Sequence, residues 1–321
     1  MNNKFDDDVL VSVVIALYNE QKYIAESIES ILLQTYRNIE ILVCDDGSTD
    51  DSAKIVKSFS DNRLLYLYQE NQGKSVALNN MISVAKGEYI IMQDADDVSF
   101  PDRIEKLLSL AIRENVDIVQ SGYNLILDGK EIAAKGKILS VNECRALIED
   151  YRIPEHDPTM FVRRTVALDI GFDPELRICQ GIDFILRVGE KYQHIVTDLI
   201  LYKYRIHAGS ITKRNITRRN LFLKMVMDKT RVRRGLLPLT EEEFGARFSQ
   251  STSSDNNLSG HFVESTYYLS SKRYHVFAIK NAIAAFSYFG ICSDVVKCWL
   301  YALTPPVVNR WGRKIVGRGK L

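Results

Sequence analysis

Cysteine is scarce in this chain, and its few copies are scattered. The cysteines are odd in number, and no two of them have the Cys-x-x-Cys spacing. A disulfide framework needs an even set, and structural zinc sites need closely spaced pairs of ligands. The sequence therefore favours neither kind of small stabilised fold and predicts a reducing compartment. The five cysteines are Cys44, Cys144, Cys179, Cys292 and Cys298.

Long hydrophobic runs are also missing. In the aromatic-rich C-terminal part, the longest uncharged window, Asn281 to Ser293, is too short to cross a hydrocarbon layer of about 30 Å. The apolar run from Val9 to Leu17 lacks the positive flank and the small-residue cleavage site of a signal peptide. We therefore expect neither a transmembrane helix nor a secretion signal, and we expect the N-terminus to stay in the cytoplasm.

Acidic residues are absent from the end of the chain. No acid follows Asp294, although the net charge is only +1. Aromatic helices followed by a cationic tail suit attachment to an anionic membrane surface. The alternative is a helical cap packed on the rest of the protein, with a solvated tail. The basic residues of this tail are Lys297, Arg310, Arg313, Lys314, Arg318 and Lys320.

The composition itself is that of a folded protein. Hydrophobic residues make up 46% of the 321 residues and charged residues 26%, which argues against disorder and against a many-pass membrane protein. This length suits one large α/β domain with an appendage. We place the α/β domain at residues 1–225 and a helical extension at 226–321.

Strand-like and helical patterns alternate through the first 115 residues, which predicts a mostly parallel sheet flanked by helices. The expected strands are Val9–Leu17, Ile39–Cys44, Leu64–Tyr68 and Tyr89–Met92, and the expected helices pass through Ile24–Leu32, Ile55–Phe59, Ala77–Ile82 and Ile104–Ile112. Beyond Ile118 the pattern loosens. There we expect a hairpin at Asp128–Gly129, a helix beginning near Thr240, and an exposed loop over Ser249–Ser259.

Polar clusters follow three of the expected strands. They are Tyr18–Glu20, Asp45–Asp46 and Asp94–Asp97. Ligands of such sheets bind at the carboxyl ends of the strands. Carboxylates held close together repel one another, and a divalent cation is the simplest compensator, with Mg²⁺ or Mn²⁺ favoured by oxygen ligands. The alternative is that these acids cap the helices that follow them.

The ordered set of motifs resembles family 2 inverting glycosyltransferases. The resemblance is strong over residues 9–115 and thinner beyond, to Ser210. It implies a GT-A fold, which is a single nucleotide-sugar-binding sheet, here with a helical C-terminal extension. The motifs are Tyr18-Asn19-Glu20, Asp45 to Asp50, Asn71-Gln72-Gly73, Lys86 to Tyr89, Asp94 to Asp97, Pro158-Thr159, Gly171 to Asp173, Gly181 to Asp183 and Tyr204 to His207.

The resemblance also implies roles for the acidic clusters. Asp45 would bind the base of the donor, usually uracil, with Tyr18 and Glu20 in the same pocket. Asp94 would meet the ribose, and Asp96 of the Asp-x-Asp motif would hold a Mn²⁺ or Mg²⁺ ion that bridges the two phosphates. We therefore expect Asp45, Asp94 and Asp96 to converge around one cleft.

The resemblance identifies the catalytic base and the residues around the diphosphate less directly. Asp183 matches the second acid of a pair common in the family, although Ile182 stands where the first is expected; the alternative is a solvated or helix-capping aspartate. His207 would contact the metal or phosphate, unless it is a loop or core histidine. Lys74 would steady the diphosphate from a helix start, unless it is simply exposed.

The acceptor side is predicted only by class. The arginine pair Arg163 and Arg164 would face the acceptor, with a surface charge pair as the alternative. A Gln-x-x-Arg-Trp motif, typical of processive synthases in this family, is absent. Together with the basic tail, this favours transfer of one sugar to a lipid-linked or cell-surface oligosaccharide at the inner face of the membrane, with no nucleic-acid partner.

Three other functions share part of these features. A sugar-1-phosphate nucleotidyltransferase would use the same fold class and metal, but the first strand is not followed by a Gly-rich basic loop to hold a triphosphate. A phosphate-accepting signalling domain also binds Mg²⁺ at strand ends, but the number and order of the motifs disfavour it. A non-catalytic sugar-nucleotide-binding protein would keep most of the same residues.

Overall fold

The computed structural model describes residues 8–127, 129–134, 136–207, 216–248 and, farther on, 278–279, 282–283, 285–286 and 293–303. The chain divides into two compact units. Unit 1 comprises Met1–Tyr123, Gly136–Ile206 and Thr217–Thr240, and unit 2 comprises Asn124–Lys135, His207–Ile216 and Glu241–Leu321. Helix α9 (Ile216–Arg233) runs through the predicted boundary at residue 225. The division into 1–225 and 226–321 stays a prediction.

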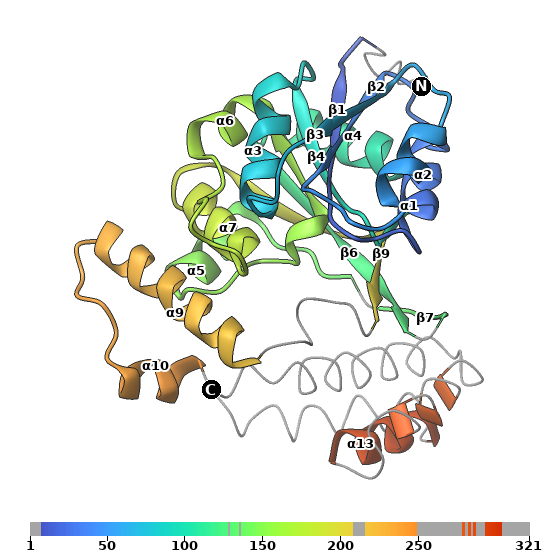
Figure 1. Ribbon diagram of the computed structural model, residues 1–321. Helices are drawn as coiled ribbons and strands as arrows, with labels where there is room; N and C mark the ends of the chain where they lie inside the picture. Colours follow the sequence, from blue (N-terminus) through green and yellow to red (C-terminus); the bar gives the residue numbers. More distant parts are fainter. Residues whose placement is uncertain are drawn as a thin grey trace. The chain divides into compact units, whose positions relative to one another are not determined.

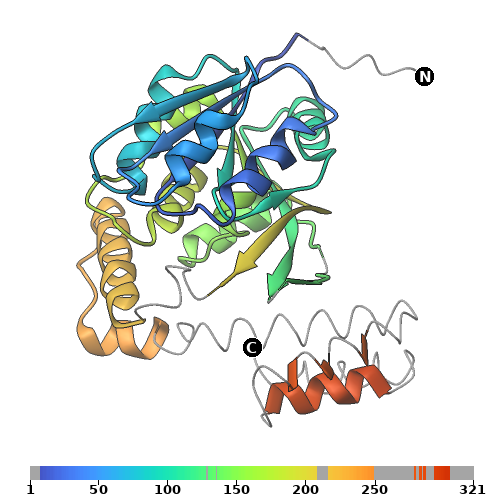
Figure 2. The same cartoon turned by 45° about the vertical axis from the view of Figure 1, so that its right-hand side comes forward.

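The sheet has four parallel strands at one side, in the order β3-β2-β1-β4 (Figure 1). Antiparallel strands follow beyond them, in the order β8-β6-β9-β5. Strand β9 lies beside β6, as Figure 2 shows. The strands are β1 (Val11–Leu17), β2 (Ile39–Asp45), β3 (Leu64–Tyr68), β4 (Tyr89–Asp94), β5 (Val98–Ser99), β6 (Ile118–Leu127), β7 (Lys130–Ile132), β8 (Met160–Arg163) and β9 (His194–Ile206). The predicted α/β fold and its four leading strands are confirmed.

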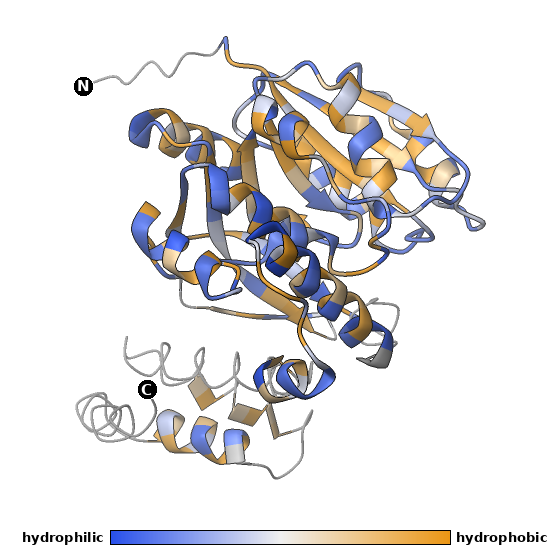
Figure 3. Cartoon of the chain, turned by 90° about the vertical axis from the view of Figure 1, so that its left-hand side faces the viewer, coloured by the Kyte–Doolittle hydropathy of each residue, from blue (hydrophilic) through white to orange (hydrophobic). Residues whose placement is uncertain are grey.

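Helices cover both faces of the parallel strands. Alternate residues of β1 pack with α1, α2 and α4 in one hydrophobic core, whereas α3 contacts β1 and β2 and packs with α6 (Figure 1). The strands are mostly hydrophobic, and the helices alternate hydrophobic and hydrophilic surface (Figure 3). The helices are α1 (Ile24–Leu32), α2 (Ser52–Ser58), α3 (Lys74–Val84), α4 (Arg103–Glu114), α5 (Val141–Glu149), α6 (Arg164–Ile170), α7 (Gln180–Lys191), α10 (Glu241–Phe248) and α13 (Ser293–Leu303), with a 3-10 turn η1 (Asp157–Thr159).

Two predictions for the later part of the chain are confirmed. Leu127 pairs with Lys130 in the expected hairpin of β6 and β7, and α10 begins directly after Thr240. The expected loop at Ser249–Ser259 and the basic tail beyond Leu303 lie outside the described residues. Among the residues that are described, no helix has both the length and the apolar character to cross a membrane.

Candidate active site

The parallel pairing brings the ends of three strands to one edge of the sheet. Leu17 of β1 pairs with Asp45 of β2, and Ala16 pairs with Asp94 of β4. Asp45 and Asp94 therefore flank the end of β1. Because neighbouring strands are about 4.8 Å apart, their backbones are about 10 Å from each other. The predicted gathering of polar clusters at this edge is confirmed.

The loop after β1 is braced by the loop after β2. Asn19, in the left-handed region at φ 55°, donates its N–H to Ser48 Oγ at 3.0 Å and accepts from the Thr49 N–H at 2.8 Å. The Glu20 N–H donates to Ser52 Oγ at 2.9 Å. These bonds hold Tyr18, which is 49% exposed, at the strand edge. Both Tyr18 and Glu20 thus follow β1 directly, beside Asp45.

Asp45 is buried and engaged at both carboxylate oxygens. Oδ1 accepts from the Ser48 N–H and Oδ2 from the Tyr66 hydroxyl, each at 2.8 Å. Burial and the bond to Asp45 together raise the pKa of Tyr66. Asp46 accepts from the N–H of Gly73 at 2.9 Å and so fixes the start of α3. Neither aspartate caps the helix that follows it, because Asp51 occupies the N-cap of α2 without a side-chain bond.

The loop after β4 carries a group of three carboxylates. Oxygens of Asp94, Asp96 and Asp97 lie within 4.8 Å of one another. Asp97 is fully buried; its Oδ1 accepts from the Arg205 N–H at 2.7 Å, whereas Oδ2 has no hydrogen-bond partner among the described residues. Burial and then the neighbouring Asp96 and Asp94 raise the pKa of Asp97. This all-oxygen donor set, with one unpartnered buried oxygen, fits Mg²⁺ or Mn²⁺.

Lys74 links α3 to this loop. Its Nζ lies 2.6 Å from Asp94 Oδ1. Burial acts to lower the pKa of Lys74, but the carboxylates of Asp94, Asp157 and Asp96 outweigh burial and raise it. Lys74 therefore carries a positive charge at neutral pH, at the first residue of a helix and beside the acidic loop. The alternative of a simply exposed lysine does not hold.

A buried arginine is hydrogen-bonded to residues on both sides of the acidic loop. Arg103 of α4 is fully buried and donates to Gln93 Oε1 at 3.1 Å and Ser99 Oγ at 2.8 Å. It also donates to the backbone carbonyls of Met92 at 2.9 Å and Pro158 at 2.7 Å. Its guanidinium lies 4.4 Å from the centre of the Tyr202 ring, and the Tyr202 hydroxyl accepts from the Asp94 N–H at 3.0 Å. Sequence reasoning missed Arg103, because nothing in its local pattern distinguishes it from an exposed helical arginine.

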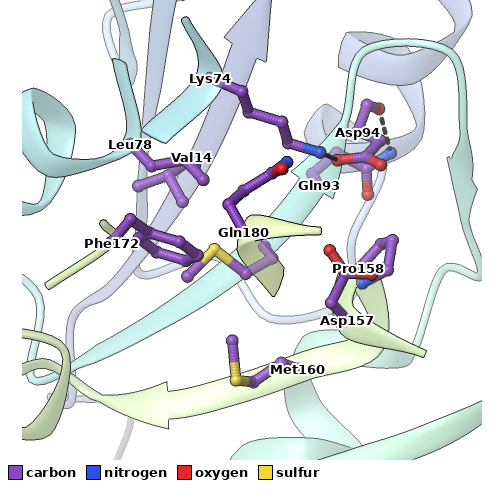
Figure 4. Close-up of a pocket in the computed structure, with 11 residues that line it drawn as sticks. Val14, Lys74, Leu78, Gln93, Asp94, Asp157, Pro158, Met160, Phe172 and Gln180 are labelled. Atoms are coloured by element: carbon purple, nitrogen blue, oxygen red, sulfur yellow. Dashed lines mark hydrogen bonds and ion pairs between the residues drawn. The ribbon is translucent and has the colours of Figure 1, made fainter. Parts of the chain in front are cut away.

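A pocket opens beside Lys74 and Asp94, and Asp157 and Gln180 face it as well (Figure 4). Sequence reasoning did not assign Asp157 a role, because the only local signal is an Asp-Pro pair between two motifs. The lining residues are Val14, Lys74, Leu78, Met92, Gln93, Asp94, Asp157, Pro158, Met160, Phe172 and Gln180.

The sequence-predicted base, Asp183, is not among the residues that line this pocket. It is 1% exposed within α7, and its Oδ2 pairs with Arg187 one turn on, at 2.6 Å from Nη2 and 2.8 Å from Nε. Arg187 in turn donates to the carbonyls of Ile170 and Gly171 at 2.6 and 2.7 Å. Asp183 thus joins α7 to the end of α6.

Arg163 and Arg164 are not among the residues that line the pocket. Arg163 pairs with Tyr89 at the opposite end of β4 from Asp94 and lies 3.0 Å from Glu88. Arg164 donates to the Gly87 carbonyl at 2.8 Å. This placement favours the charge-pair alternative for both arginines. His207 follows the end of β9 and is the first residue of its stretch in unit 2, and its role as a ligand stays a prediction.

The fold is that of the GT-A nucleotide-diphospho-sugar transferases, as the sequence predicted. The structure of S. aureus TarS 1–349 in complex with UDP-GlcNAc matches with a TM-score of 0.60 and 18% identity over 94% of this chain and 92% of that one. The mannosyltransferase PcManGT from Pyrobaculum calidifontis, in complex with GDP-Man and Mn²⁺, matches with a TM-score of 0.55 and 19% identity over 94% and 87%. At these identities the two structures show the fold alone.

The chain belongs to glycosyl transferase family 2, a family of transferases. The model of this family matches residues 12–169. An uncharacterized glycosyltransferase of Methanocaldococcus jannaschii is 32% identical over 62% of this chain and 72% of its own length. Glycosyltransferase GlyG of Streptococcus pneumoniae is 48% identical over a match that covers 36% of this chain and 39% of GlyG.

Proposed function

We propose that this chain transfers a single sugar from a nucleotide-diphosphate sugar, with UDP as the nucleotide, to a hydroxyl of a lipid-linked or cell-surface oligosaccharide. The observation that carries the proposal is the Lys74–Asp94 pair beside Asp96, at the strand edge of a family 2 chain. Binding of UDP-GlcNAc by TarS, which shares the fold, supports the choice of donor.

The donor roles follow from the strand edge. Asp45, with Tyr18 and Glu20 from the neighbouring loop, would bind the base, and Asp94 would meet the ribose. Lys74 would contact the diphosphate, since its positive charge lies at the N-terminal end of a helix, where anions are favoured. Asp96 and His207 would hold a Mn²⁺ or Mg²⁺ ion, which when bound stabilises the charge that develops on the leaving diphosphate.

The reaction would be a single displacement with inversion. The acceptor hydroxyl oxygen forms a bond to the anomeric carbon on the side opposite the diphosphate. The bond from that carbon to the phosphate oxygen breaks, and its electron pair leaves with the nucleoside diphosphate. The hydroxyl proton passes to a carboxylate of this chain acting as general base.

Attachment to the inner face of the membrane is the second part of the proposal. It rests on the basic residues after Asp294, which the sequence shows, and each basic side chain near an anionic surface contributes about 1 kcal/mol. We expect the full chain to sediment with anionic vesicles and a chain ending at residue 270 to stay in the supernatant. Equal sedimentation of the two would contradict the attachment.

A donor panel tests the transfer reaction. We expect the purified protein with Mn²⁺ to release UDP from one UDP-sugar, faster with membrane extract than without it, because the extract supplies the acceptor. GDP- and TDP-sugars serve as matched controls, and coupled assays measure nucleoside diphosphate and pyrophosphate separately. Pyrophosphate formed from UTP and a sugar 1-phosphate would instead identify a nucleotidyltransferase. Tight donor binding with no turnover in any mixture would identify a binding protein.

A further inference from the structure

Two aspartates compete for the role of general base, and only one of them lines the pocket. Asp157 lies at the first position of η1 and faces the pocket together with Lys74 and Asp94 (Figure 4). Asp183 does not line it. A base must reach the acceptor hydroxyl directly or through one water, so it must lie near the leaving diphosphate. Asp157 shares the pocket wall with Lys74, the proposed diphosphate contact.

The contacts of α7 commit Asp183 elsewhere. Gln180, the first residue of this helix, lines the pocket, whereas Asp183 is not among the lining residues. Asp183 is 1% exposed and pairs with Arg187, which donates to the Ile170 carbonyl and so ties Asp183 to the end of α6.

Asp157 occupies the space that a side chain at position 181 would fill. A Cβ built on Gly181 would collide with the Asp157 carboxylate. The carboxylate at the pocket-facing first turn of α7 therefore comes from the neighbouring segment and not from the helix. Glycine at 181 is what makes room for it.

The segment that carries Asp157 is held by buried donors on both sides. Arg103 donates to the Pro158 carbonyl and also to Met92 of β4, the strand that ends in Asp94. Gln120 of β6, also fully buried, donates to the His156 carbonyl at 2.9 Å. These bonds fix Asp157 relative to the donor edge of the sheet, and such fixed placement of a reacting group lowers the barrier to reaction.

We propose that Asp157, and not Asp183, is the general base of the transfer reaction, an assignment that rests on the proposed function. The Asp157 carboxylate takes the proton of the acceptor hydroxyl as the oxygen bonds to the anomeric carbon. The electron pair of the broken bond to phosphate leaves with UDP, so the products are the glycoside, UDP and a protonated Asp157. Asp183 is a structural residue that locks α7 onto α6.

Three variants test this assignment. Asp157→Asn is expected to bind UDP with Mn²⁺ as the wild type does, by calorimetry, while its kcat falls by roughly 10²- to 10⁴-fold, the usual contribution of a general base. The matched control, Asp183→Asn, is expected to lower Tm while keeping kcat per folded molecule. The exchange variant Asp157→Gly with Gly181→Asp returns a carboxylate to the same space, and we expect it to regain activity over Asp157→Gly alone.

The outcomes separate this assignment from the proposed function. A wild type that releases UDP beside an equally active Asp157→Asn overturns the assignment and leaves the function standing. So does an Asp183→Asn variant that keeps its Tm and its UDP binding but loses transfer. A folded, UDP-binding exchange variant no more active than Asp157→Gly counts against the assignment as well. A wild type that turns over no nucleotide sugar overturns both.

Discussion

Replacing Asp96 by Asn is expected to weaken Mn²⁺-dependent binding of UDP by roughly 100-fold or more, the equivalent of about 3 kcal/mol. Oxygens of Asp94, Asp96 and Asp97 lie within 4.8 Å of one another, and Asn at 96 removes one charged oxygen ligand from this group. Arg205 donates to the backbone carbonyl of Asp96 at 2.7 Å, a contact that the substitution leaves in place. Calorimetry with UDP, in Mn²⁺ and in chelator, measures the effect.

Asp102→Asn is the matched control for this variant. It makes the same change of charge a few residues along the chain, at a side chain that is 39% exposed and pairs with Lys106 across one turn of α4. An exposed pair of this kind contributes little, so UDP binding should be unchanged. UDP affinity of Asp96→Asn that equals the wild type in Mn²⁺ would contradict the assignment of Asp96 as a ligand.

Replacing Arg103 by Met is expected to lower the free energy of unfolding by about 3–5 kcal/mol. Burial lowers the pKa of Arg103 to about 10, so the side chain still carries its charge at neutral pH. Its loss leaves the carbonyls of Met92 and Pro158, both buried residues, without these donors. In a domain of this size the change corresponds to a fall in Tm of about 10 °C, which thermal and urea unfolding measure.

Arg113→Met on the same helix is the control. The Arg113 side chain is 65% exposed and pairs only with its neighbour Glu114 among the contacts of the described residues, so its loss should change stability by less than about 0.5 kcal/mol. If Arg103→Met unfolds at the same urea concentration as Arg113→Met, Arg103 does not hold the site together. Arg103→Met is also expected to lower the rate of sugar transfer per folded molecule, because Arg103 connects β4 to the segment that carries Asp157.

Much of the donor edge follows from local sequence. The run from Val11 to Leu17 is apolar at nearly every position, which marks a strand buried on both faces, and the acids come directly after such strands. Parallel strands bring their carboxyl ends to one edge, so Asp45 and Asp94 are placed by a rule that needs no knowledge of distant packing. Their convergence is only partial, however, since Asp94 and Asp96 lie together while Asp45 lies across the end of β1.

The sequence by itself determined the order of strands and helices in the first 115 residues, the family, and the edge at which the predicted donor residues lie, because these depend on short-range periodicity and on motifs that directly follow strands. Only the tertiary structure decided that Arg103 is buried, that Asp183 is committed to Arg187, and that Asp157 fills the space beside Gly181. These features depend on contacts between segments far apart in the chain. No local pattern encodes which of two aspartates faces a pocket, because the packing of α7, η1 and β4 sets that direction.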